Sequence, residues 1–108
     1  KITATLIFEK MQDFVEKKIP IQREAWLEVA FKLDILRLDE AKVFNKMFRV
    51  VKQKELDIYK SQEKRNKSAA ELEVQSSKEY QFMRDQEALL YSIDEMIRVA
   101  KKSADLNF

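Results

Sequence analysis

The 108 residues of this chain include no glycine, no histidine, no cysteine and only one proline. Glycine is the residue that most readily adopts positive φ, so its absence disfavours hairpin turns, phosphate-binding loops and multi-stranded sheets. Proline breaks helices, and Pro20 alone is present to do so. We therefore predict a single, all-helical domain with few loops.

The missing residue types also exclude much chemistry. Without histidine or cysteine the chain lacks the usual zinc ligands and nucleophile–base pairs, and without glycine it lacks the P-loop and the dinucleotide-binding motif. The acidic pairs Asp39–Glu40 and Asp94–Glu95 are adjacent in sequence and diverge on a helix, so they do not suit joint acid–base catalysis. We predict that the chain is not an enzyme and has no metal, cofactor or small-molecule substrate.

Lysine and arginine number 21 and aspartate and glutamate 19, for a net charge of +2. This near balance creates no overall field that would attract nucleic acid or a membrane. The longest uncharged run, residues 2–8, is far shorter than the roughly 20 residues that cross a bilayer. We expect no membrane association, and the lack of cysteine is compatible with a cytoplasmic location.

Apolar residues recur at three- and four-residue steps near the N-terminus, which predicts an amphipathic helix over about residues 3–18. The residues of this stripe are Ala4, Ile7, Phe8, Met11, Phe14 and Val15. The alternation of Ile2, Ala4, Leu6 and Phe8 leaves a short strand as an alternative. Pro20 disfavours helical geometry at Ile19 and suits the first turn of a new helix, so we place a break there.

A second break is predicted at residues 66–68. Asn66 tolerates a left-handed helix end, and Ser68 followed by Glu71 has the spacing of a capping box. This predicts long helices over about residues 21–65 and 69–104. Since no residue here forbids a helix, one uninterrupted helix through this point is the alternative.

Folding back near residue 67 brings together residues whose numbers sum to about 134, so that apolar stretches of the two long helices coincide. Leu36 then faces Ile97, Phe44 faces Leu90, and Val51 faces Met83. The predicted seam contains Trp26, Val29, Leu33, Leu36, Val43, Met47 and Val50 on one helix and Met83, Leu90, Ile93, Ile97, Ala100 and Ala104 on the other. We predict an elongated antiparallel helical hairpin with the short N-terminal helix packed on its base.

The base of this hairpin has more apolar surface than two helices need, because nine of the thirteen residues 26–38 are apolar. A helix that is apolar nearly all round is buried on more than one side. We therefore predict a homo-oligomer that forms through the base. The candidate interface residues are Trp26, Phe31, Ile35, Leu38, Leu89, Met96 and Val99.

The predicted hairpin tip is basic. Residues 49–67 carry seven positive and three negative charges, against nine and eight in residues 1–48 and five and eight in residues 68–108. Cations at the C-terminal end of a helix also favour its dipole, which is an alternative explanation. As a candidate site for phosphates and an unpaired base, the tip offers Arg49, Lys52, Lys54, Tyr59, Lys60, Lys64, Arg65 and Lys67.

The stretches Leu56–Ser61, Ser68–Glu73 and Leu89–Ile97, together with Trp26 near the start of the long helix, resemble a known family. They are similar to the small helical recombination mediator proteins of tailed phages, the UvsY type, over about residues 24–104. The resemblance implies a ring-like oligomer that binds single-stranded DNA and loads a recombinase in exchange for a single-strand-binding protein. It supplies no binding motif residue by residue, so the candidate DNA contacts remain the basic residues above.

A competing hypothesis from another class is a helical interaction protein, such as a scaffold, adaptor or chaperone, that binds no nucleic acid. In this hypothesis the apolar base binds a helix of a partner protein. The two hypotheses differ in whether the basic tip binds nucleic acid in a salt-dependent manner.

Overall fold

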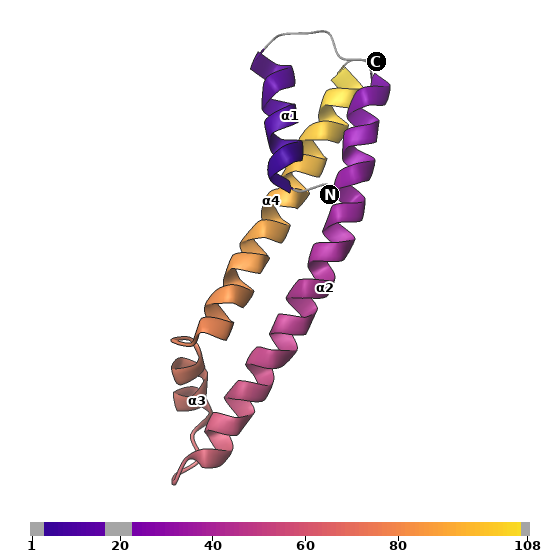
Figure 1. The fold of residues 1–108 in the computed structure, drawn as a ribbon. Helices are drawn as coiled ribbons and strands as arrows, with labels where there is room; N and C mark the ends of the chain where they lie inside the picture. The colour runs from indigo at the N-terminus through magenta and orange to yellow at the C-terminus, as the bar shows by residue number, and fades with distance from the viewer. Residues whose placement is uncertain (1–3, 17–22, 107–108) are drawn as a thin grey trace. The chain divides into compact units, whose positions relative to one another are not determined.

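The computed structural model of this chain describes residues 4–16 and 23–106. Within them the elements are α1 (Ala4–Glu16), α2 (Arg23–Ser61), α3 (Lys67–Val74) and α4 (Lys78–Leu106), as Figure 1 shows. All of these elements are helices, which confirms the predicted all-helical class. The predicted break at Pro20 lies outside the described residues, as do the predicted helix ends near residues 3, 17–18 and 21–22.

The chain divides into two compact units. Unit 1 comprises Lys1–Asp39 and Leu90–Phe108, and unit 2 comprises Glu40–Leu89. Both α2 and α4 contribute one segment to each unit, whereas α1 belongs to unit 1 and α3 to unit 2.

The core of unit 1 is formed by three helices. It buries Ile7 and Met11 of α1, Trp26, Val29, Ala30, Leu33 and Leu36 of α2, and Ile93, Ile97, Ala100 and Ala104 of α4. Among the residues whose burial is described, Leu33 and Ile93 have the largest side chains with no exposed surface. Because Ala4–Glu16 is a helix that buries Ile7 and Met11, the short strand considered for this segment is wrong.

We expect Leu33→Ala to lower the free energy of unfolding by about 3 kcal/mol, because it leaves a cavity in a closely packed core. Leu33 is 0% exposed, whereas Leu72 on α3 is 68% exposed. Leu72→Ala is therefore the matched control and is expected to change stability by less than about 0.5 kcal/mol. Urea unfolding followed by circular dichroism at one protein concentration measures both, and equal losses for the two variants would contradict the assigned core.

The core of unit 2 joins α2, α3 and α4. Val51, Val74 and Met83 are buried in one cluster, and the partly buried side chains packed against it are Phe44, Met47, Ile58 and Tyr80. The predicted opposition of Val51 and Met83 is confirmed. Val43 and Val50 are 39% and 41% exposed, so their predicted places in the apolar seam are wrong.

A polar contact explains this shift of the seam. Gln86 is buried and donates its amide to the backbone oxygen of Glu40 at 3.0 Å and also to the Glu40 carboxylate. Glu40 therefore occupies the core-facing turn of α2, and the buried face continues through Phe44, Met47 and Val51 instead of Val43 and Val50. Lys54 contacts Glu79 further along, so α2 and α4 run antiparallel within unit 2.

The first break after α2 differs from the predicted one. The helix ends at Ser61, and residues 62–66 form a loop. Asn66 has extended dihedral angles, φ −134° and ψ 110°, and its side chain accepts a hydrogen bond from the Ala69 amide at 3.1 Å. Asn66 is therefore the N-cap of α3, not a left-handed helix end, and Ser68 lies inside α3. Both the predicted capping box and the alternative of an uninterrupted helix are wrong.

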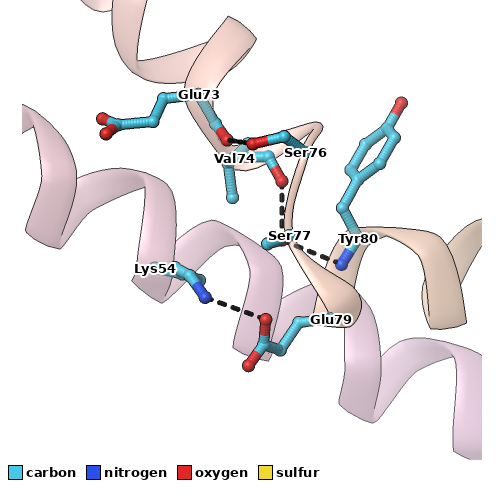
Figure 2. Close-up of polar contacts among 7 residues, drawn as sticks. All are labelled: Lys54, Glu73, Val74, Ser76, Ser77, Glu79 and Tyr80. Atoms are coloured by element: carbon cyan, nitrogen blue, oxygen red, sulfur yellow. Dashed lines mark hydrogen bonds and ion pairs between the residues drawn. The ribbon is translucent and has the colours of Figure 1, made fainter.

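A second break divides the helix that was predicted over residues 69–104. Figure 2 shows the turn between α3 and α4, in which the Ser76 hydroxyl donates to the Glu73 carbonyl at 2.8 Å and the Ser77 hydroxyl to the Val74 carbonyl at 2.6 Å. The Ser77 hydroxyl also accepts a hydrogen bond from the Tyr80 amide at 3.2 Å, so Ser77 caps α4. The turn lets Val74 reach the cluster with Val51 and Met83.

Candidate nucleic-acid interface

The predicted basic residues lie on the last turns of α2, on the loop 62–66 and at the start of α3, all within unit 2. The loop is held by side-chain hydrogen bonds. The Gln62 side chain accepts from the Asn66 amide at 2.7 Å, and Asn66 in turn caps α3. These bonds fix the loop without glycine.

A hollow of about 480 Å³ lies beside this loop, and we call it the Tyr59 hollow. Its lining includes the ring of Tyr59, the apolar Leu56 and Ala70, and the charged Lys52, Glu55 and Lys67. The guanidinium carbon of Arg65 lies 5.8 Å from the centroid of the Tyr59 ring. The hollow thus combines an aromatic surface with cations, and its volume accommodates a nucleobase.

The predicted cations fall into two groups. Lys52 pairs with Glu55 at 3.5 Å, and Lys54 pairs with Glu79 at 2.9 Å. Lys52 and Lys54 are therefore engaged within the protein, and the structure does not place them among the available cations. Lys54 instead connects α2 to the first turn of α4 (Figure 2).

The other predicted cations are available. Among the residues that the structure describes, no ion pair involves Lys60, Lys64, Arg65 or Lys67, and all four are exposed. We call these four the loop cations. Arg49 is also exposed, and it donates a hydrogen bond at 3.4 Å to the Asn45 carbonyl one turn earlier. Of the carboxylates, Glu63, Glu71 and Glu73 are exposed near the loop cations in sequence, whereas Glu79 is occupied by Lys54.

The contact between Lys54 and Glu79 lowers the pKa of Glu79 below its ordinary value, chiefly through the hydrogen bond from Lys54. We expect Lys54→Gln to raise the pKa of Glu79 towards that value, which a carbon-detected NMR titration of the carboxylates measures. Because the folded-state pKa is depressed, the stabilising contribution is present at neutral pH and is lost as the pH falls through the folded pKa. An unchanged Glu79 titration in the variant would contradict the contact.

Two cations were missed in the sequence. Lys42 and Lys46 are exposed on α2 and lie in unit 2, but they precede residues 49–67, the segment that was predicted to be basic. The signal was present in their spacing, since Lys42, Lys46 and Arg49 follow four- and three-residue steps and so share one helix face. The net charge of a sequence segment does not reveal cations that share one face of a helix.

The predicted oligomer residues are distributed unevenly. On α2, Phe31 and Leu38 are each 64% exposed and Ile35 is 48% exposed, so they form one exposed apolar face in unit 1, the α2 face. Trp26 is 5% exposed and belongs to the core of unit 1, so its side chain is not on the surface of the single chain. Of the remaining predicted residues, Val99 is exposed, whereas Met96 and Leu89 are half-buried. Leu89 belongs to unit 2 and the other two to unit 1.

Unit 1 also contains an apolar hollow of about 370 Å³ between α1 and α4. Met11 of α1 and Tyr91, Ser92, Glu95, Met96 and Val99 of α4 line it. The adjacent carboxylates Asp94 and Glu95 diverge as expected, because Asp94 pairs with Arg37 and Glu95 pairs with Arg98 at 2.8 Å. Each of these contacts raises the pKa of its arginine.

In the part of the chain that the structure describes, no group of three or more acidic residues could hold a metal ion. None of the described helices is both long enough and apolar enough to cross a membrane. Comparison of this chain with protein families, with curated proteins and with solved structures finds no match.

Proposed function

We propose that this chain is a non-enzymatic helical protein that binds single-stranded nucleic acid through the loop cations and the Tyr59 hollow. The observation that carries this proposal is the grouping of Lys60, Lys64, Arg65 and Lys67 beside an aromatic hollow, all without an acidic partner among the described residues. Cations that contact phosphates supply most of the affinity for a polynucleotide. An aromatic surface beside them favours an unpaired base, which can stack where a paired base cannot.

Within this function, the specific role that we propose is that of a recombination mediator. This assignment rests on the resemblance of Leu56–Ser61, Ser68–Glu73 and Leu89–Ile97 to the UvsY-type proteins of tailed phages. It implies that the chain acts in the cytoplasm, assembles into a ring-like oligomer and loads a recombinase in exchange for a single-strand-binding protein.

The exposed α2 face supports the oligomer part of this proposal. Three large apolar side chains, Phe31, Ile35 and Leu38, occur within two turns of one helix on the surface of the isolated chain. Removing such surface from water is favourable by several kcal/mol. An oligomer would place several sets of loop cations on one strand, and simultaneous contacts multiply a weak affinity.

A titration of fluorescent oligo(dT) with the protein at 50 mM and 200 mM salt tests the proposed function. Four phosphate contacts on a single strand give a slope of log K against log salt of about −3, so we expect affinity to fall at least about 50-fold between the two conditions. Absence of binding at 50 mM salt, or binding that does not respond to salt, would contradict the proposal.

The second candidate is a helical interaction protein that binds no nucleic acid. It is favoured by the apolar hollow of unit 1, whose lining includes Met11, Met96 and Val99 and which could receive an apolar side chain of a partner. Methionine-rich surfaces adapt to different apolar partners. Absence of oligo(dT) binding by a chain that still forms oligomers would favour this candidate over the first.

A further inference from the structure

Four exposed cations lie on one face of α2. Three of them are not among the loop cations, and the fourth is Lys60. The four are Lys42, Lys46, Arg49 and Lys60, and all belong to the part of α2 in unit 2. With 3.6 residues per turn, these four positions fall within a sector of about 60° around the helix axis. Gln53 is the one other residue of α2 between Lys42 and Lys60 in this sector.

This basic face points away from the core. The buried and partly buried side chains of the same stretch, Phe44, Met47, Val51 and Ile58, lie on the opposite side of α2. Asp57 borders the basic face, and its carboxylate accepts a hydrogen bond from the Gln53 amide at 2.9 Å. The sector itself therefore contains no carboxylate.

The arrangement is unfavourable for the helix on its own. Lys42 and Lys46 are like charges four residues apart, and Lys46 and Arg49 are like charges three residues apart, spacings at which side chains meet and repel. Lys42 and Lys60 each have an aspartate three positions earlier, but neither Lys46 nor Arg49 has an acidic residue three or four positions away on either side. A solvated helix face of an ordinary kind alternates charges of opposite sign, as Glu28 and Lys32 do at 3.1 Å on the same helix.

The spacing fits a polyanion that follows the helix. Lys42, Lys46 and Arg49 are separated along the axis by about 6 Å and 4.5 Å, which is of the order of the distance between successive phosphates of a strand. Lys60 lies at the other end of the face and is also one of the loop cations. The face and the loop are thus joined through a residue that they share.

We propose that the phosphate backbone of a bound nucleic-acid strand leaves the loop at Lys60 and continues along the outer face of α2 past Arg49, Lys46 and Lys42. This inference rests on the proposed function and extends it by naming Lys42 and Lys46 as contacts. The Tyr59 hollow then takes a base at one end of the bound strand, and the basic face holds the backbone beyond it.

The test compares the salt dependence of oligo(dT) binding for three proteins. In the first variant Lys42→Ala and Lys46→Ala are combined, since alanine keeps the helix and removes both charges. The matched control combines Lys101→Ala and Lys102→Ala, an exposed pair on α4 in unit 1. A 30-nucleotide strand is used, and circular dichroism verifies that helicity is unchanged.

Each lost phosphate contact reduces the slope of log K against log salt by about 0.7, so we expect the Lys42/Lys46 variant to lose about 1.4 from the slope and roughly 25-fold in affinity near 100 mM salt. The control is expected to keep the slope of the unmodified protein. Equal slopes for the variant and the unmodified protein would overturn the α2 contact while leaving binding at the loop intact. Absence of binding by the unmodified protein would overturn the proposed function and this inference together.

Discussion

Changing Lys60, Lys64 and Lys67 together to glutamate is expected to lower the affinity for oligo(dT) at least 100-fold. The three side chains are exposed, and no ion pair in the described part of the chain involves them. The change removes the three proposed contacts with phosphates and adds three negative charges that would repel the strand. Fluorescence anisotropy with a labelled strand at 0.1 M salt measures the loss.

The control for this variant carries the same change of net charge elsewhere. Lys78, Lys101 and Lys102 are exposed on α4, and their combined replacement by glutamate also lowers the net charge by six. We expect this control to retain affinity within about threefold, because long-range charge is screened over about 10 Å at 0.1 M salt. If the loop variant retained its affinity, or if both variants lost it equally, the loop would not be the binding site.

If the chain forms the proposed oligomer, replacing Phe31, Ile35 and Leu38 together with glutamine is expected to convert it into a monomer. These side chains are between 48% and 64% exposed in the single chain, so the replacement removes apolar surface without opening the core. Glutamine is a good helix former, so α2 is expected to persist. Sedimentation velocity at tens of micromolar protein measures the change, and the monomer is expected to bind a long oligo(dT) more weakly because linked contacts are lost.

Leu72→Gln combined with Phe82→Gln is the matched control, since both side chains are exposed in unit 2. This control is expected to sediment as the unmodified protein does. A monomeric unmodified protein at this concentration would contradict the predicted oligomer, and an oligomer that survives the triple change would show that another surface holds it together.

The helical class and part of the register could be predicted from the sequence, because both depend on periodicity. Val51 faces Met83 as the spacing of apolar residues predicted. The predicted placement of Val43 and Val50 in the seam was wrong because it assumed that only apolar residues pair across the two helices. The buried Gln86 bonds to Glu40 instead, and a polar residue satisfied across a helix pair has no apolar signal in the sequence.

The breaks were harder to place because they depend on side-chain hydrogen bonds and not on glycine or proline. Asn66 was identified as the residue of the break, but its role is that of an N-cap in an extended conformation. The turn at Ser76 and Ser77 was missed, although serine is a common N-cap and two adjacent serines were the available signal. Val74, just before this turn, packs in the cluster with Val51 and Met83, a contact that only the tertiary structure reveals.

For the candidate site, the sequence predicted the residue types but not their availability. Lys52 and Lys54 belong to the same basic segment as Lys60, yet they pair with Glu55 and Glu79. Lys54 and Glu79 are 25 positions apart, and their contact depends on the register of two helices. Trp26 was expected at an interface, but it is 5% exposed and buried within unit 1.

Photo-crosslinking of the protein to an oligonucleotide that contains 5-iododeoxyuridine tests whether a base binds in the Tyr59 hollow. The base analogue crosslinks to aromatic side chains that stack on it, and mass spectrometry identifies the modified peptide. We predict a crosslink at Tyr59, in the hollow beside the loop cations, that is lost in 1 M salt and in Tyr59→Leu. A crosslink at the exposed Tyr91 of unit 1 in place of Tyr59, or no crosslink at 50 mM salt, would contradict it.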